Sequence, residues 1–396
     1  MRLAFLTSLI PVARPDTGFE IANAAILDGL RAAGHDVTAI GFLRPGEVAA
    51  DPDLAIVLDH VAIENAAVSG QTKLRWLSTA MLRGLPVACA KLWLAGRGRL
   101  VETVRKHGPF DAIVLNSVML PGAFPELLDI APCVLVEHNV EYVSAQQSAD
   151  HADSTLMRWL YRREARTLHK VEHEACAKAT YVWVLAEEDR QTLGALIAHK
   201  SATLPLVSGP DKTDAAAAPD IAPQYDVGLI GTWTWAPNFI GLDWFLKEVA
   251  PHLRADIRVA VAGRLPEGVT APANVALLGR VPNSQAFLAS CRTLALTSRA
   301  GTGVQLKTIE AFQIGKPAVA TPLSLRGFTE LPGNVRRAGE AAEFAQAVAT
   351  LVDEVRLQGS TPDVAWREGQ AFMARQRDKM AAVLADGLKR ASGPIH

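Results

Sequence analysis

The sequence has no strong excess of either charge. Lysine and arginine together number 40 and aspartate and glutamate 41, which gives a formal net charge of −1. Proteins that coat nucleic acid usually carry a large basic surplus, so this balance argues against that class. Charged residues make up only 20% of the 396 residues and apolar residues 49%. That composition excludes wholesale disorder and predicts a sizeable buried core in two domains of ordinary size.

Cysteines are few and widely separated. The four, Cys89, Cys133, Cys176 and Cys291, form no Cys-x-x-Cys pair and no Cys/His cluster. Neither a disulfide framework nor a structural zinc site is therefore indicated. We expect a reduced, cytoplasmic protein with no bound metal.

Long hydrophobic runs are also missing. Residues 1–10 hold one cation and an apolar run that resembles a secretion signal, but Pro11 ends the run early. The run is far shorter than the roughly 20 residues that span a bilayer. We expect it to form the first strand of a buried parallel sheet rather than a targeting signal.

The N-terminal half alternates apolar runs with helical stretches. Ala22, Ile26 and Leu30 recur at helical spacing, and Gly34 is placed to end that helix in the left-handed conformation. Strand, glycine turn, helix and strand form the unit of a doubly wound α/β sheet. The strands expected here are residues 3–9, 37–42, 111–115, 133–137 and 181–185.

A polar, small-residue segment divides the chain. Residues 208–223 are rich in Pro, Asp, Ala and Gly, which is typical of a linker. We expect one Rossmann-like domain over residues 1–207 and a second over 224–362, with a final helix over 363–396 that packs back towards the first domain. The second domain's expected strands are residues 226–231, 257–263, 275–278, 293–297 and 316–321.

The densest motif lies between Gly301 and Pro317. Two glycines, Gly301 and Gly303, follow a strand and expose backbone N–H groups at the start of a helix, which suits a phosphate. Gly303, Lys307 and Glu310 then share one helix face. Lys307 offers charge to a diphosphate, and Glu310 offers two acceptors to the hydroxyls of a ribose. The alternative is an exposed ion pair between Lys307 and Glu310.

This segment resembles the donor motif of the family 4 glycosyltransferases, which have the GT-B fold. Glu310 to Pro317 match its second half, while the family's first acidic residue falls on Thr302, as in a subgroup with Gly-Thr-Gly there. The resemblance implies two Rossmann-like domains that face each other across a cleft. It implies that Thr302, or the backbone of Gly303 and Val304, contacts the donor sugar, and that the nucleotide diphosphate sugar is a substrate with no cofactor.

Further matches follow along the second domain. The family's Arg and Lys, which neutralise the diphosphate, are replaced here by Thr232 and Asn238, close to Gly231. The resemblance therefore implies that Lys307, Arg264 and the start of the helix after Gly303 neutralise the diphosphate instead. The resemblance also places the loop with Arg280 and Val281 along the nucleotide base.

The first domain carries two more matches, and it is the acceptor side in this family. Gly18 stands where the family has a glycine loop near the donor phosphate. His138, in Glu137-His138-Asn139-Val140-Glu141, matches a histidine that faces the sugar. A lone histidine at a strand end is more often structural, but its expected position at the cleft favours the functional interpretation.

A basic stretch lies between Gln71 and His107. It holds eight cations against one acid, interleaved with apolar residues, and Trp76 and Trp93 are candidate membrane wedges. Such a surface fits a peripheral membrane contact, and it fits equally well ordinary helices with a solvated charged face.

The expected function is transfer of a sugar from a nucleotide diphosphate sugar to an acceptor hydroxyl, with retention at the anomeric carbon. The expected acceptor is a saccharide or a lipid-linked saccharide of bacterial surface polysaccharide or glycolipid synthesis, at the inner face of the membrane. Lys307 and His138 are the expected catalytic residues. The alternatives are a GT-B nucleotide-sugar epimerase or hydrolase, and a non-catalytic two-domain sugar-binding protein.

Overall fold

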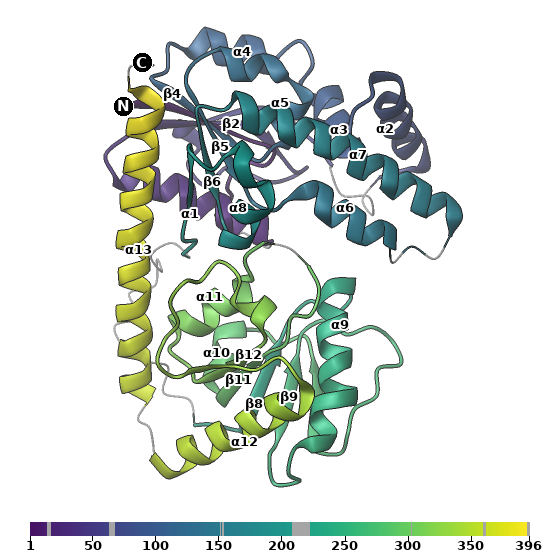
Figure 1. Cartoon of the computed structure of the whole chain (residues 1–396), viewed down its shortest axis with the longest axis vertical. Coiled ribbons are helices and arrows are strands. Elements are labelled where there is room, and N and C mark those ends of the chain that lie inside the picture. Colours follow the sequence, from purple (N-terminus) through teal and green to yellow (C-terminus); the bar gives the residue numbers. More distant parts are fainter. Residues whose placement is uncertain are drawn as a thin grey trace. The chain divides into compact units, whose positions relative to one another are not determined.

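The computed structural model describes residues 1–13, 17–62, 68–150, 152, 154–207, 222–301, 303–358 and 362–393 (Figure 1). The chain divides into two compact units. The N-terminal unit comprises Met1–Gly209 and Lys379–His396, and the C-terminal unit comprises Pro210–Asp378. The expected linker, residues 208–223, lies outside the described residues except at its last two positions.

The N-terminal unit is built on a seven-stranded sheet in the order β3-β2-β1-β4-β5-β6-β7. Its neighbouring strands all pair in parallel. The strands are β1 (Arg2–Thr7), β2 (Asp36–Leu43), β3 (Ala55–His60), β4 (Ala112–Asn116), β5 (Cys133–Glu137), β6 (Tyr181–Val184) and β7 (Ser201–Thr203).

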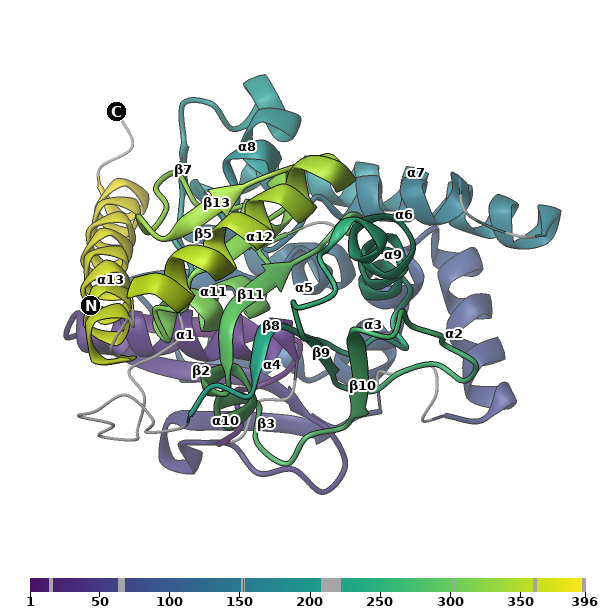
Figure 2. The same ribbon diagram turned by 90° about the horizontal axis from the view of Figure 1, so that it is seen from below.

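Helices flank this sheet (Figures 1 and 2). The first helix shows why they form: Thr17 and Glu20 make a reciprocal capping box at its start, and Ala22, Ile26 and Leu30 are buried. Gly34, with φ of 82°, follows its end as expected. The helices are α1 (Gly18–Ala32), α2 (Gly70–Arg83), α3 (Val87–Gly96), α4 (Leu100–His107), α5 (Met119–Ala123), α6 (Glu141–Asp150), α7 (Thr155–Lys178) and α8 (Glu187–Leu193).

The C-terminal unit is built on a six-stranded parallel sheet in the order β10-β9-β8-β11-β12-β13. Its strands are β8 (Tyr225–Ile230), β9 (Val259–Ala262), β10 (Val275–Gly279), β11 (Cys291–Leu296), β12 (Ala318–Ala320) and β13 (Val335–Arg337). Its helices are α9 (Ala236–Trp244), α10 (Ser284–Ala289), α11 (Leu306–Gln313), α12 (Ala341–Gln358) and the first part of α13 (Pro362–Ser392).

The core of the C-terminal unit lies between its sheet and two helical segments. Leu242 on α9 and Phe245 and Val249 on the π-helical turn that continues it are fully buried. They pack with strand residues and with α12, where the Phe344 ring meets the Trp244 ring edge-on at 5.3 Å. This packing holds the end of α9 against the sheet and α12.

The last helix, α13, contributes to both units. In the C-terminal unit Phe372 packs edge-on against the Phe312 ring at 5.7 Å between ring centres. In the N-terminal unit a Cβ at Gly29 of α1 would stand only 2.9 Å from Leu384, so the two helices are in close contact there. The helix therefore adds apolar surface to each unit.

The strands that the sequence did not indicate are β3, β7 and β13. Each stands at an edge of its sheet or is only three residues long. Edge strands lack the continuous apolar run that marks a strand covered on both faces. In the described part of the chain, no helix is long and apolar enough to cross a membrane.

Candidate functional site

Each sheet has a point where the chain reverses its direction of strand addition. In the N-terminal unit this point lies between β1 and β4, and in the C-terminal unit between β8 and β11. Ligands of doubly wound α/β folds bind at the carboxyl ends of the strands at this point. The expected site residues can therefore be placed against these two edges, one in each unit.

Buried polar side chains fill the edge in the N-terminal unit. Thr7 and Asn116 end β1 and β4 and stand opposite each other in the sheet. His138, directly after β5, donates from Nε2 to Asn116 Oδ1 at 2.8 Å. Asn116 Nδ2 donates in turn to Asn23 Oδ1, and Asn23 Nδ2 donates to Thr7 Oγ1 at 3.0 Å and to the Leu9 carbonyl at 3.0 Å. The four side chains form one directional chain of hydrogen bonds.

His138 is held as a neutral imidazole. It is 8% exposed, its ring centre lies 4.9 Å from that of Phe19, and burial lowers its pKa to about 4. With Nε2 donating to Asn116, the neutral ring leaves Nδ1 as an acceptor. The ring therefore offers hydrogen bonding, not charge, at the end of β5. Gly18 is the residue before Phe19 and opens α1 beside this ring.

Backbone strain lies at the same edge. Ser117, directly after Asn116, has φ of 99°, a conformation that non-glycine residues rarely adopt. Its N–H donates to the Val136 carbonyl of β5 at 3.1 Å, and its hydroxyl accepts from the Met119 N–H at 3.2 Å. Such outliers persist where the surroundings hold them, and they gather at functional sites.

Carboxylates gather beneath His138. Glu137 and Glu172 are each 1% exposed, and Glu141 and Asp189 act on Glu137 through space. Burial raises the pKa of Glu141 to about 6 and that of Glu172 to about 7, and it raises the pKa of Glu137. Glu172 accepts the Glu141 N–H at 2.7 Å, so this buried group also fixes the start of α6. Among the described residues, no group of His, Cys, Asp and Glu is arranged to hold a metal ion.

In the C-terminal unit, glycines let two strand ends approach each other. A Cβ on Gly263, which has φ of 114°, would stand only 1.8 Å from the Gly231 carbonyl oxygen. No other residue type fits there without moving the strands. Arg264 follows, and its carbonyl accepts the Trp233 N–H at 2.9 Å. The Arg264 side chain itself is exposed, so its guanidinium is available to a ligand.

The loop between β8 and α9 holds two more expected residues. The Thr232 carbonyl accepts from Asn238 Nδ2 at 3.2 Å, which folds the loop onto the first turn of α9. Asn238 Oδ1 accepts from Lys307 Nζ at 3.4 Å. Lys307 Nζ also lies 5.9 Å from the centre of the Trp233 ring. Gly231, Thr232, Asn238 and Lys307 thus form one connected cluster at this edge.

The glycine loop precedes α11. Gly301 and Gly303 have φ of 106° and 71°, so the loop turns as the motif predicts. Thr302 lies outside the described residues. Gly303 is buried and Val304 half-buried, and the loop is tied back by the Ser298 hydroxyl, which donates to Gln305 Oε1 at 3.1 Å.

Lys307 and Glu310 on α11 do not pair with each other. No ion pair joins them, and among the described residues neither has a partner of opposite charge. Burial lowers the pKa of Lys307 to about 8 and raises the pKa of Glu310. The alternative that they form an exposed ion pair is therefore wrong. Partial burial of two charges without a counter-charge is costly, so a ligand that supplies the opposite charge or hydrogen bonds would stabilise both.

Arg280 and Val281 lie one strand further out. They follow β10, and Gly279 at its end accepts the Gly263 N–H at 2.7 Å. Arg280 is exposed and Val281 half-buried. The expected donor residues of the C-terminal unit therefore line the carboxyl ends of β10, β9 and β8 and the start of α11.

The basic stretch between Gln71 and His107 is only partly a free surface. Trp76 is 7% exposed with Lys91 Nζ 4.3 Å from its ring centre, and the guanidinium of Arg83 covers Trp93 at 3.5 Å. Trp76 as a membrane wedge is therefore wrong, because its ring is buried under a cation. The exposed apolar side chains of this stretch are Leu74, Met81 and Leu82 on α2.

Sequence reasoning missed the polar chain behind His138. Thr7 and Asn116 each end an otherwise apolar strand, and Asn23 interrupts the apolar face of α1. A polar residue at the last position of a buried strand was the available signal, because buried polar groups need partners. The pairing among them depends on strand order, which the sequence did not give.

The two parallel α/β units define the GT-B fold, and comparison with solved structures confirms this class. The structure of HepE from Anabaena in complex with UDP is 16% identical, with 98% of this chain and 100% of that chain covered and a TM-score of 0.60. Sucrose-phosphate synthase from Thermosynechococcus elongatus is 14% identical, with 97% and 98% covered and a TM-score of 0.64. WaaG, a glycosyltransferase involved in lipopolysaccharide biosynthesis, is 14% identical, with 99% and 100% covered and a TM-score of 0.61.

Residues 224–354 match the protein family described as Glycosyl transferases group 1. This range contains every expected donor-binding residue of the C-terminal unit. No curated protein sequence matches the chain. The family match, together with the fold, supports nucleotide-sugar glycosyl transfer as the activity. It also supports a relationship to the GT-B glycosyltransferases.

Proposed function

We propose that the protein is a retaining glycosyltransferase of family 4, which moves a sugar from a nucleotide diphosphate sugar to an acceptor hydroxyl. The observation that carries this proposal is the pair Lys307 and Glu310. Both are partly buried, and neither has a counter-charge among the described residues. They follow a glycine loop inside the range that matches the glycosyltransferase family. A cation for the diphosphate and a carboxylate for the ribose fit that donor.

The reaction needs no protein nucleophile. The acceptor oxygen forms a bond to the anomeric carbon on the face from which the diphosphate departs, and the bond from that carbon to the diphosphate oxygen breaks. The acceptor hydroxyl proton passes to the departing diphosphate, which keeps the bonding electrons. Stabilising the developing negative charge is then the main task of the protein.

Lys307 performs that task in this proposal, with the N–H groups at Gly303 and Val304. Glu310 holds the ribose hydroxyls through charge-assisted hydrogen bonds. Arg264 adds a second cation near the diphosphate, and Arg280 with Val281 lies along the base. Thr232 and Asn238 shape the loop that holds Lys307, since Asn238 accepts from its ammonium.

His138 orients the sugar in this proposal. Its neutral ring is fixed by Asn116, so Nδ1 offers one acceptor in a set direction. A neutral acceptor suits a sugar hydroxyl.

The proposed acceptor is a saccharide or a lipid-linked saccharide in bacterial surface polysaccharide or glycolipid synthesis, at the inner face of the membrane. WaaG, which shares the fold, is involved in lipopolysaccharide biosynthesis. Exposed Leu74 and Leu82 beside the exposed cations Lys73 and Arg75 on α2 support a peripheral membrane contact through this part of the basic stretch.

The test is incubation of the whole protein with UDP-, GDP- and ADP-sugars, with and without a bacterial lipid extract, followed by NMR of the anomeric linkage. Transfer that needs an acceptor and keeps the anomeric configuration is the expected result. Release or epimerisation of the sugar without an acceptor would identify the hydrolase or epimerase instead. Binding of the sugar without any turnover would identify a sugar-binding protein.

A further inference from the structure

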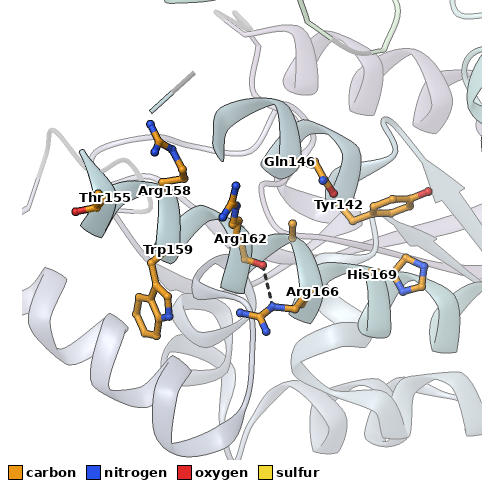
Figure 3. Close-up of a pocket in the computed structure, with 9 residues that line it drawn as sticks. Tyr142, Gln146, Thr155, Arg158, Trp159, Arg162, Arg166 and His169 are labelled. Atoms are coloured by element: carbon orange, nitrogen blue, oxygen red, sulfur yellow. Dashed lines mark hydrogen bonds between the residues drawn. The ribbon is translucent and has the colours of Figure 1, made fainter. Parts of the chain in front are cut away.

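A hollow lies between α6 and α7 of the N-terminal unit, and its lining residues are distinct from those of the polar chain at His138. Its volume is about 720 Å³. Its lining is basic and aromatic, as Figure 3 shows. The side chains that matter are Tyr142 on α6 and Arg158, Trp159, Arg162, Arg166 and His169 on α7, which together are called the α6–α7 arginine pocket.

Three arginines follow one another along α7 with helical spacing. Arg158, Arg162 and Arg166 are each four residues apart, which puts the three residues on one face of the helix. Among the described residues, none of them forms an ion pair with a carboxylate. In the part of the chain that the structure describes, their hydrogen bonds go only to backbone carbonyls, from Arg158 to Ala152 at 3.1 Å and from Arg166 to Arg162 at 3.3 Å.

A neighbouring arginine on the same helix shows the opposite behaviour. Arg163 donates to the carbonyls of Ala80 at 2.7 Å and Leu85 at 3.1 Å, and lies 3.6 Å from a Glu164 oxygen. That arginine ties α7 to α2. The three pocket arginines tie nothing together, so packing does not explain why they share one face.

The pocket extends along α6 and α7, from the start of α6 near Tyr142 to the start of α7 near Arg158. Tyr142 follows His138 by four residues, and its ring meets that of His169 edge-on at 4.8 Å. Arg158 stands eleven residues before His169, which is about 16 Å along a helix at 1.5 Å per residue. One end of the pocket therefore lies at the start of α6, which follows β5 in the chain, and the other lies at the first turns of α7.

The outer end is apolar as well as basic. Trp159 is 50% exposed and lines the pocket, and the neighbouring Leu156 and Met157 are 65% and 40% exposed. Guanidinium groups recognise phosphate through paired N–H donors. A ligand with a phosphate or diphosphate next to an apolar chain would contact both the arginines and the apolar side chains at the outer end.

We infer that the α6–α7 arginine pocket binds the phosphate or diphosphate group of the acceptor. The inference rests on the proposed function, because it takes the ligand to be an acceptor whose sugar lies towards His138. Arg162 and Arg166 contact the phosphate oxygens, and Arg158 adds charge at the outer end. The phosphate-bearing ligand is either lipid-linked or soluble, and the two sources differ in whether Trp159 contributes.

The test is calorimetric titration of the whole protein with inorganic diphosphate and with farnesyl diphosphate, each with the donor site saturated by a nucleoside diphosphate. The variants are the double variant Arg162→Gln with Arg166→Gln, and Lys170→Gln as a control. Lys170 is on the same helix but outside the pocket, with 75% of its side chain exposed. We expect the double variant to lose about tenfold or more in affinity and the control to keep the wild-type affinity.

The second variant, Trp159→Ala, separates the sources. If Trp159→Ala weakens the affinity for farnesyl diphosphate and leaves that for inorganic diphosphate unchanged, the ligand is lipid-linked. If the variant binds both probes as the wild type does, the ligand is soluble. If the double variant binds inorganic diphosphate and farnesyl diphosphate as tightly as the wild type, the proposal that the pocket binds a phosphate group is wrong. The affinity for the nucleoside diphosphate is measured on the wild type and on the same variants. If the wild type does not bind it, the proposed function is refuted. A diphosphate affinity that depends on the arginines would still support an anion site in the pocket.

Discussion

The two strand edges at which ligands are expected are built in opposite ways. In the N-terminal unit, His138, Asn116, Asn23 and Thr7 satisfy one another in a buried chain without charge. In the C-terminal unit, Lys307 and Glu310 carry charge, and neither has a counter-charge among the described residues. The first edge is uncharged and leaves open the acceptor His138 Nδ1, whereas among the described residues the second lacks a counter-charge for each of its two charges.

This difference indicates which ligand part each edge takes. A fixed, neutral hydrogen-bonding edge suits the hydroxyls of a sugar, because orientation is needed there and charge is not. An edge with a free cation and a free carboxylate suits a diphosphate and a ribose. The pKa shifts agree: burial lowers that of His138 to about 4, so it is neutral, and that of Lys307 to about 8, so it is still mostly charged at neutral pH.

Removing the carboxylate of the C-terminal edge should have the largest effect. Glu310→Ala should cost about 2–4 kcal/mol in nucleoside diphosphate binding, because two charge-assisted hydrogen bonds to ribose are lost. Calorimetry measures the loss. The matched control is Glu248→Ala, which removes an exposed glutamate of the same unit and should change nothing. Undiminished binding in Glu310→Ala would contradict the assignment.

Removing the cation of the same edge should come next. Lys307→Met should lower turnover by roughly 10²-fold, the usual cost of one preformed electrostatic donor. The control is Lys247→Met, since Lys247 is exposed and paired with Asp243 at 2.8 Å. A Lys307 variant within a few-fold of wild type would transfer the role to Arg264 or to the backbone.

Breaking the polar chain of the N-terminal edge should affect stability instead of nucleotide binding. Asn116→Ala leaves His138 and Asn23 without their shared partner, at a cost of about 1–3 kcal/mol in the free energy of unfolding. Local hydrogen exchange at the ends of β4 and β5 measures this cost. The affinity of Asn116→Ala for the nucleoside diphosphate should stay at the wild-type value. A loss of affinity as large as the loss of stability would contradict the conclusion that only the C-terminal edge binds this ligand.

The smallest expected effect concerns the carboxylates beneath His138. The folded pKa of Glu172 is raised by burial to about 7, so its contribution to stability is present below about pH 4.5 and is lost as the pH rises towards 7. The stability of wild type relative to Glu172→Gln should therefore fall by about 1 kcal/mol or more between pH 4.5 and 7.5.

The His138 shift has the opposite sign. Its folded pKa is lowered, so its contribution is lost as the pH falls from about 6.5 to about 4. It occurs in both proteins and cancels in the difference between their unfolding profiles. Parallel profiles for wild type and Glu172→Gln would show that Glu172 titrates normally.

The sequence predicted the parts of the fold that are buried on both faces. The apolar runs at 133–137 and 181–185 match β5 and β6 closely, since helices cover both faces of these strands. It did not predict β3, whose residues are all half-buried or exposed, because an edge strand needs no continuous apolar run. The C-terminal edge was predicted from the glycines and charges of one short segment.

The N-terminal edge and the α6–α7 arginine pocket were harder to predict. Asn116 and Thr7 are far apart in sequence and meet only because β1 and β4 are neighbours in the sheet. The sequence analysis did not single out the pocket arginines, because cations at helical spacing are also typical of a solvated helix face. The basic stretch that it singled out was residues 71–107. There, Arg83 and Lys91 lie over tryptophan rings, a contact that helical periodicity does not reveal.

The charged edge of the C-terminal unit is the proposed site of the nucleoside diphosphate. Hydrogen–deuterium exchange of the whole protein, with and without a saturating nucleoside diphosphate chosen from UDP, GDP and ADP, locates the binding site. We expect slower exchange in the segments 231–244 and 298–313, which carry Asn238, Lys307 and Glu310. Slower exchange confined to the ends of β4 and β5 in the N-terminal unit would contradict it.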